Sequence, residues 1–141
     1  IEQVSKPELK KWSQSADKII GERIDLIESS KDFIRLIKES GIEPAKNQYL
    51  EIKAAQPEAK IFFEAPMNAL GYEYLFAARL DESVEIFELN VMEYPESWNA
   101  YDSLGEAYLK INEIDKAKAN YLKSIELNPE NENGIKILKD L

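Results

Sequence analysis

The sequence predicts an all-α protein, a right-handed superhelical stack of helices, and three observations support this fold class. Two segments match each other at a separation of 34 residues: Leu70, Gly71, Tyr74, Leu75, Asp81 and Pro95 recur as Leu104, Gly105, Tyr108, Leu109, Asp115 and Pro129. A fixed period of this size is typical of stacked helical pairs. Apolar residues recur at three-to-four spacing along much of the chain, and no segment alternates as a half-buried strand would.

Composition fits one domain, or one and a half, with a hydrophobic core. The chain has 141 residues, of which 44% are hydrophobic, so it can bury a large share of its surface. It contains no Cys and no His, which excludes disulfides and zinc–thiolate sites and removes the commonest general base. No signal peptide or membrane-spanning segment is visible. Because the chain begins with Ile, we expect a processed protein or an excised fragment.

The net charge of −9 is concentrated in the second half of the chain. Residues 1–63 hold 11 basic and 11 acidic residues, whereas residues 64–141 hold 7 basic and 16 acidic. Between Arg79 and Lys110 there is no cation. An acidic surface repels nucleic acid and anionic membranes, so neither is expected as a partner. The alternative interpretation is ordinary solubilisation of exposed helices by acidic residues.

Three helices are predicted before the repeats. A capping box, Ser5-x-x-Glu8, begins an amphipathic helix over residues 7–28, with an apolar face of Leu9, Trp12, Ala16, Ile19, Ile20, Ile24 and Ile27. Ser29 and Ser30 are expected to break it and to cap a short second helix that ends at Gly41. A third helix is predicted from Pro44 to Gln56.

The remaining chain divides into a link, two repeats and a cap. Residues 57–65 are expected to be an extended link whose aromatic side chains plug into the repeat array. Gly71 and Gly105 lie in the middle of predicted helices, so we expect close packing of the second helix of each repeat there. Residues 131–141 are expected to form a capping helix that ends at or near a native C-terminus. The predicted boundaries are 1–63 for the N-terminal helical segment, 64–97 and 98–131 for the repeats.

These repeats resemble the tetratricopeptide family. Its pattern W-x2-L-G-x2-Y…A-x3-F…P reads here as Met67-x2-Leu70-Gly71-x2-Tyr74…Ser83-x3-Phe87…Pro95, then as Tyr101-x2-Leu104-Gly105-x2-Tyr108…Ala117-x3-Tyr121…Pro129. The resemblance covers residues 64–131, about half of the chain. It implies two helical hairpins and a non-catalytic scaffold that binds a peptide or a neighbouring domain through its concave face.

The same resemblance implies a binding surface on the first helix of each repeat. Carried onto this chain, the partner-binding residues are Asn68, Tyr72, Phe76, Asn99, Asp102 and Glu106. The subclass that grips a C-terminal carboxylate is disfavoured, because Asn68, Tyr72 and Ser103 depart from its pattern of Lys and Asn. The two acids favour a basic or neutral partner protein or peptide. The alternative is that Tyr72 and Phe76 pack against the upstream helices and leave no open groove.

A second resemblance extends upstream, from Phe33 to Leu75, to a tail found on many bacterial exported hydrolases. In those proteins a β-lactamase-type or esterase domain precedes a helical link and two tetratricopeptide repeats. This resemblance implies an alternative function, an accessory C-terminal region that positions or dimerises a larger bacterial hydrolase. It also favours an extracytoplasmic location, and it leaves a homodimer open.

No catalytic, cofactor-binding or metal-binding residues are predicted. Ser15-x-x-Lys18 matches a penicillin-binding-protein motif, but no K-T-G accompanies it and no sheet would carry its pocket. Carboxylate pairs such as Glu82 and Glu85 have ordinary helical spacing, and no calcium loop of alternating oxygen ligands is present. We therefore expect no enzyme activity, no cofactor and no membrane insertion.

Overall fold

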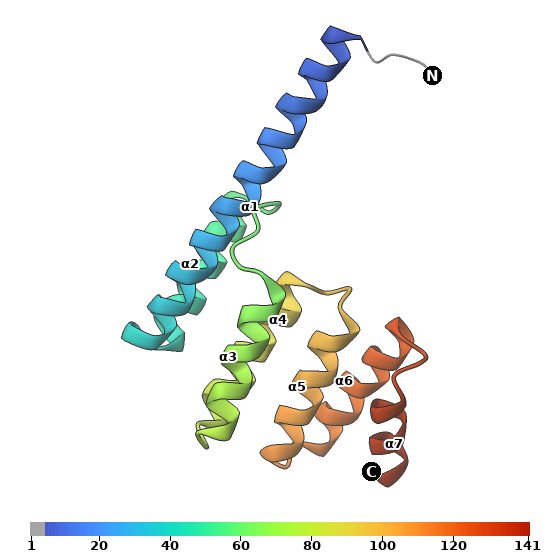
Figure 1. Ribbon diagram of the computed structural model, residues 1–141. Helices are drawn as coiled ribbons and strands as arrows, with labels where there is room; N and C mark the ends of the chain where they lie inside the picture. The colour runs from blue at the N-terminus through green and yellow to red at the C-terminus, as the bar shows by residue number, and fades with distance from the viewer. Residues whose placement is uncertain (1–4) are drawn as a thin grey trace.

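The computed structural model describes residues 5–141, except for the side chains of Leu9 and Trp12, so the predicted placement of those two side chains lies outside it. The described chain forms seven helices: α1 (Lys6–Ser40), α2 (Ile42–Ala55), α3 (Glu64–Phe76), α4 (Leu80–Glu93), α5 (Trp98–Lys110), α6 (Ile114–Leu127) and α7 (Glu132–Asp140). Residues 5–141 contain no strand, which confirms the all-α prediction. In Figure 1, α3 to α7 stack side by side, while the N-terminal half of α1 projects away from them. None of these helices is long and apolar enough to cross a membrane.

The prediction of three N-terminal helices was wrong, because residues 6–40 form one continuous helix. Neither serine interrupts it. The Ser30 hydroxyl donates to the Leu26 carbonyl oxygen one turn back, at 2.8 Å, and the Ser29 hydroxyl donates to the Ile61 carbonyl oxygen at 2.5 Å. A serine hydroxyl that bonds the carbonyl four residues back is compatible with an intact helix. The helix continues to Gly41, whose φ of 91° suits glycine at a helix end.

The link before the repeats contributes to the first hydrophobic core, and its aromatic Phe62 packs against the N-terminal helices as well as the first repeat, which was the only contact expected. Phe62 is fully buried, and its ring stacks on Phe33 of α1 at 5.3 Å and lies 6.0 Å from the ring of Tyr49 of α2. The same cluster includes Met67 and Ile86 of the first repeat. One core therefore spans the N-terminal helices and the α3–α4 hairpin.

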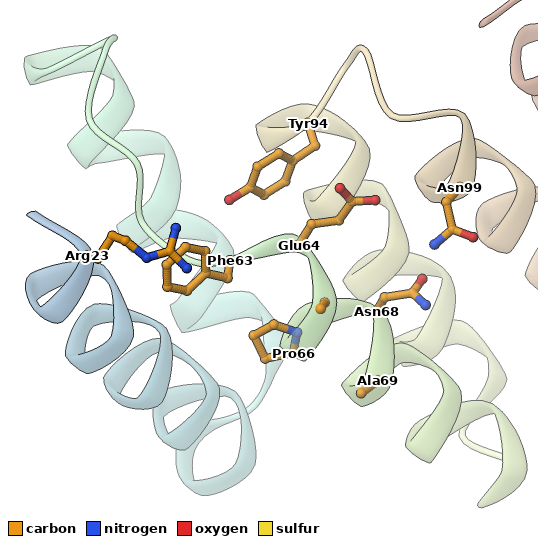
Figure 2. A pocket seen from close by; sticks show the side chains of 9 residues that line it. Arg23, Phe63, Glu64, Pro66, Asn68, Ala69, Tyr94 and Asn99 are labelled. Atoms are coloured by element: carbon orange, nitrogen blue, oxygen red, sulfur yellow. The ribbon is translucent and has the colours of Figure 1, made fainter. Parts of the chain in front are cut away.

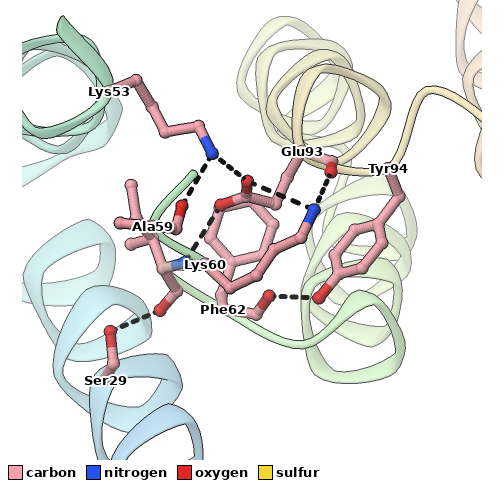
Figure 3. A network of polar contacts seen from close by, with 8 residues as sticks. Ser29, Lys53, Ala59, Lys60, Phe62, Glu93 and Tyr94 are labelled. Atoms are coloured by element: carbon pink, nitrogen blue, oxygen red, sulfur yellow. Dashed lines mark hydrogen bonds and ion pairs between the residues drawn. The ribbon is translucent and has the colours of Figure 1, made fainter. Parts of the chain in front are cut away.

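A buried carboxylate joins the same parts of the molecule (Figure 3). Glu93, at the end of α4, is 1% exposed. Its Oε1 atom accepts from Lys53 Nζ of α2 at 2.6 Å, and its Oε2 atom accepts from the backbone N–H of Ile61 at 3.1 Å. Lys60 Nζ donates to the Glu93 carbonyl oxygen at 2.9 Å. The neighbouring Tyr94 hydroxyl donates to the Phe62 carbonyl oxygen at 2.5 Å.

The two mid-helix glycines allow the close packing that the sequence predicted. A Cβ atom added at Gly71 would lie 2.4 Å from Cε1 of Phe87, which is on the second helix of the same repeat. At Gly105 it would lie 2.9 Å from Cε2 of Tyr121. Each aromatic ring therefore occupies the space that a side chain on the facing helix would need.

Helix α7 packs against α6 and closes the C-terminal end of the stack. Its N-cap residue, Asn131, is buried and accepts from the Gly134 N–H at 3.1 Å. The Asn131 amide donates to Asp102 Oδ1 at 2.7 Å and to Ser124 Oγ at 2.9 Å. One side chain thus connects α7 to both helices of the second repeat.

Candidate functional site

The predicted binding residues lie on two neighbouring helices, α3 and α5. We call their common surface the α3/α5 face: Asn68, Tyr72 and Phe76 of α3 with Asn99, Asp102 and Glu106 of α5. The Tyr72 hydroxyl bridges the two helices by donating to Glu106 Oε2 at 2.7 Å. Side chains 34 residues apart in the sequence are therefore in direct contact.

One part of this face, toward the C-terminal end of α3, combines the aromatic pair Tyr72 and Phe76 with the two acids Asp102 and Glu106. The rings of Tyr72 and Phe76 stack with centroids 5.9 Å apart, and Tyr72 also meets the Phe87 ring edge-on at 5.1 Å. Phe76 is 80% exposed, so the expected alternative, in which it packs against the upstream helices, is wrong for this residue. Tyr72 is half-buried, against Phe87 of its own repeat.

Burial raises the pKa values of two groups in this part of the face, Asp102 and Tyr72. Burial raises the pKa of Asp102, the Asn131 hydrogen bond opposes this rise, and the nearby Glu106 adds to it. Burial also raises the pKa of Tyr72 to about 12, and Glu106 contributes in the same direction. Tyr72 therefore remains a protonated hydrogen-bond donor at neutral pH. Because no cation lies between Arg79 and Lys110, the carboxylates make the surrounding potential negative.

Near the N-terminal ends of α3 and α5, the face opens into a cavity of about 670 Å³. Asn68 and Asn99 lie at one end and Arg23 and Phe63 at the other, with Glu64 between them (Figure 2). The Arg23 guanidinium sits over the Phe63 ring, 5.2 Å from its centroid. A cavity of this size, with a few polar groups on partly apolar walls, is suitable for a ligand side chain or a short peptide segment.

Three described residues, Asn68, Asn90 and Tyr121, have a buried side-chain polar atom without a hydrogen-bond partner, and of these only Asn68 lines the cavity. Its Oδ1 atom is buried and has no hydrogen-bond partner. Buried amide oxygens are nearly always paired, and leaving one unpaired costs about 1–3 kcal/mol. A ligand that donates an N–H group to this oxygen would remove that cost once a rotation of the Asn68 side chain brings the oxygen to the cavity surface.

The structure thus brings the six predicted residues together in two groups, and it adds cavity residues that sequence reasoning missed. Arg23 and Phe63 belong to the segment before the repeats, and nothing in their local sequence indicates that α1 reaches the first repeat. Leu75, the neighbour of Phe76 on α3, is buried in the second hydrophobic cluster and does not belong to the face.

Other candidate chemistry finds little support in the described residues. Ser15 and Lys18 are both exposed on the projecting part of α1. Within residues 5–141, leaving aside the side chains that are not described, no group of three or more acidic residues is arranged to hold a metal ion.

Comparison with known proteins agrees with this fold. Residues 99–131 match the tetratricopeptide repeat family. The first tetratricopeptide domain of Spaghetti (RPAP3), solved with the HSP90 peptide SRMEEVD, is similar with a TM-score of 0.54 and 17% identity, over 82% of this chain and 88% of that one. The first tetratricopeptide domain of human RPAP3, solved by NMR, is similar with a TM-score of 0.53 and 17% identity, over 82% and 87% of the two chains.

A search of curated protein sequences finds no match. The structural similarities, at 17% identity, concern the fold. They agree with the helical hairpins described above and with the 34-residue period. Residues 99–131 therefore carry a tetratricopeptide repeat, and the described chain has a tetratricopeptide-type fold.

Proposed function

We propose that this chain is a protein-interaction module that binds an extended, basic or neutral peptide segment along the α3/α5 face. The observation that carries the proposal is the buried, unpaired Oδ1 atom of Asn68 beside the cavity. Peptide backbones supply N–H donors at regular intervals, so one of them can pair with this oxygen. The proposal assigns the main contacts to residues 64–141, and Arg23 of the N-terminal segment closes one end of the cavity.

Each group on the face has a part in this binding. Phe76 and Tyr72 supply apolar contact area, because exposed aromatic residues often dominate binding at interfaces. Asp102 and Glu106 attract a basic side chain of the ligand. The Asn68 and Asn99 amides hold the peptide backbone. Ion pairs at an exposed surface contribute little each, so we expect a modest affinity that falls as salt rises.

The structurally similar RPAP3 domain supplies a useful probe, because its HSP90 peptide, SRMEEVD, is acidic. We propose the opposite charge preference for this chain. Titration of labelled SRMEEVD and of its charge-inverted counterpart SEMKKVK against the protein tests this directly. The basic peptide should bind more tightly, and the difference should shrink at high salt. Tighter binding of the acidic peptide, or no binding of either, would overturn the proposal.

Substitutions locate the site. Phe76→Ala should weaken binding of both peptides, because its exposed ring contributes contact area and little to folding. Glu106→Lys should reverse the preference between the two peptides. Matched controls are Leu122→Ala and Glu126→Lys, which change exposed residues of α6 in the same way. Equal effects of site and control variants would place the binding surface elsewhere.

Asn68→Ala tests the amide itself. A hydrogen bond of this type contributes about 0.5–1.5 kcal/mol, so we expect affinity for both peptides to fall by roughly two- to tenfold. Since Asn68 Oδ1 has no partner in the free protein, the melting temperature should not fall with it. Unchanged affinity would show that this oxygen does not contact the ligand.

A further inference from the structure

Helix α1 is far longer than the helix that covers it. It has 35 residues and α2 has 14, which correspond to lengths of about 52 Å and 21 Å at the usual helical rise. The α1 residues that are buried, Ser30, Phe33 and Ile37, all belong to its C-terminal part. Figure 1 shows the N-terminal part extending beyond every other helix. We call residues 6–28 the projecting segment: none of their described side chains is buried, although Arg23, near the end of the segment, lies over Phe63 of the link.

The projecting segment carries a stripe of exposed isoleucines. Ile20, Ile24 and Ile27 follow at spacings of four and three residues, which places them on one face, and they are 57%, 54% and 41% exposed. Ile19 flanks them and is 58% exposed. Most helices in proteins owe their stability to the packing of an apolar face rather than to intrinsic helix propensity. Such a stripe therefore calls for a covering partner.

The charges of the segment indicate which partner. Residues 6–15 contain three cations and one acid, Lys6, Lys10, Lys11 and Glu8. Residues 16–28 contain two cations and four acids, Lys18, Arg23, Asp17, Glu22, Asp25 and Glu28. The two halves thus carry net charges of +2 and −2. A second identical segment is complementary to the first only when the two run in opposite directions.

We infer that the projecting segment is a self-association surface, on which α1 of a second copy of this chain packs antiparallel. A two-fold axis near Asp17, the midpoint of the segment, places Lys6 opposite Glu28 of the second copy, and Lys10 within one residue of its Asp25. The small side chain of Ala16, on the isoleucine face, allows the helices to approach near this axis. The rest of each molecule then lies at opposite ends of the helix pair. Such a symmetric contact closes as a dimer.

The first test measures the oligomeric state of the 141-residue chain by sedimentation equilibrium over a series of concentrations. We expect a monomer–dimer equilibrium. Ile20→Glu with Ile24→Glu should weaken it by about tenfold or more, which corresponds to about 1.4 kcal/mol. The control pair is Met92→Glu with Leu122→Glu, which places the same charges at exposed apolar positions of α4 and α6 and should leave the dimer intact. A wild-type chain that stays monomeric at every concentration would overturn the inference and assign the stripe to a different partner.

Charge exchange provides a second test. One variant replaces Lys6, Lys10 and Lys11 by Glu, and the other replaces Glu22, Asp25 and Glu28 by Lys. Each variant alone should dimerise more weakly than wild type, because both of its halves then carry the same sign. Mixing the two should restore association as a heterodimer. Failure of the mixture to associate, with both variants folded, would contradict the electrostatic basis of the pairing.

Engineered cysteines report the orientation, since the natural chain has none. Ser13→Cys alone should not cross-link under oxidation, because in the antiparallel pair the two copies of residue 13 lie about 12 Å apart along the axis. A mixture of Ser13→Cys and Ile20→Cys should form a mixed disulfide, since both positions lie on the isoleucine face and come within one residue of each other along the pair. Efficient self-linking of Ser13→Cys would show a parallel dimer and overturn the proposed geometry.

Discussion

The spacing between the two helices of each repeat depends on single glycines. At Gly71 the Phe87 ring leaves no room for a Cβ atom, and at Gly105 the Tyr121 ring comes slightly less close. Gly21 of α1 also lies inside a helix, but nothing lies within 4 Å of the position where its Cβ would be. The same residue type thus has a packing role in the repeats and none in the projecting segment.

Alanine substitution should separate these roles. Gly71→Ala forces Phe87 to move and should lower the free energy of unfolding by about 1–3 kcal/mol, with a smaller loss for Gly105→Ala. Gly21→Ala should instead stabilise α1 by up to about 1 kcal/mol, since alanine favours the helix and meets no neighbour. Urea unfolding of the three variants measures the difference. A Gly71→Ala protein as stable as wild type would show that close packing at this residue is unimportant.

Asp102 is a second residue whose surroundings lead to a prediction. Its folded-state pKa is raised above the ordinary value, so its ionised form is less favourable in the folded state than in the unfolded state. This penalty is present above the raised pKa and disappears as pH falls through it. Asp102→Asn keeps an oxygen that can accept from Asn131 and removes the charge. We expect it to stabilise the protein at neutral pH.

The advantage of Asp102→Asn over wild type should shrink as pH falls toward the ordinary aspartate pKa, about 4. Unfolding measured at neutral and acidic pH gives this difference directly. Asp140→Asn, at an exposed position on α7, serves as the control and should show little change in stability at either pH. A constant difference between wild type and Asp102→Asn across this range would contradict the raised pKa.

At the scale of elements, the sequence predicted the repeats better than the helices before them. The repeats are marked by local signals, the glycines and the prolines Pro95 and Pro129 that follow α4 and α6. The error at Ser29 and Ser30 arose because serine favours helix ends when its hydroxyl has no other partner. Here one hydroxyl bonds the link at Ile61, a contact 32 residues away that no local pattern indicates.

The capping helix α7 should be required for a stable, soluble second repeat. Ile135, Ile137 and Leu138 are partly buried, and Asn131 bonds both helices of that repeat. Deletion of residues 131–141 exposes this surface and leaves Ser124 without its Asn131 contact. We expect a sharply lower melting temperature or aggregation, because burying three such side chains contributes up to several kcal/mol. Deletion of residues 139–141 alone is the control, and an equal effect of both deletions would argue against this role.

At the scale of the whole molecule, the candidate site depends on how the N-terminal helices meet the repeats. Repeat positions alone predicted Asn68 and Asn99, because the resemblance fixes them by register. Arg23 could not be predicted, since it reaches the cavity through the packing of α1 against the link. Glu93 was missed for a similar reason: as a glutamate near a helix end it reads as a surface residue, and only the fold brings Lys53 and Ile61 to it.

The contacts of Glu93 with Lys53 and Ile61, which we call the Glu93 junction, determine whether the N-terminal helices and the repeats behave as one body. Lys53→Met removes the closest cation from a carboxylate that is almost fully buried, while the side chain of Lys60 remains 3.8 Å away and compensates in part. Removing one partner of a buried pair costs up to 3–5 kcal/mol, and because Lys53 is itself partly exposed we expect a loss of about 2–3 kcal/mol. The control is Lys38→Met, which breaks the exposed pair between α1 and Glu73 of α3 and should cost less than about 1 kcal/mol.

Hydrogen exchange shows where this loss acts. In Lys53→Met, the amides of α2 and of the link should exchange faster relative to those of α5 and α6, because the weakened contact lies between the N-terminal helices and α4. The position of Arg23 at one end of the cavity depends on the same contact, so affinity for both peptides should also fall. Uniformly faster exchange across all helices would show instead that the chain unfolds as a single cooperative unit and that Glu93 stabilises the whole rather than the junction.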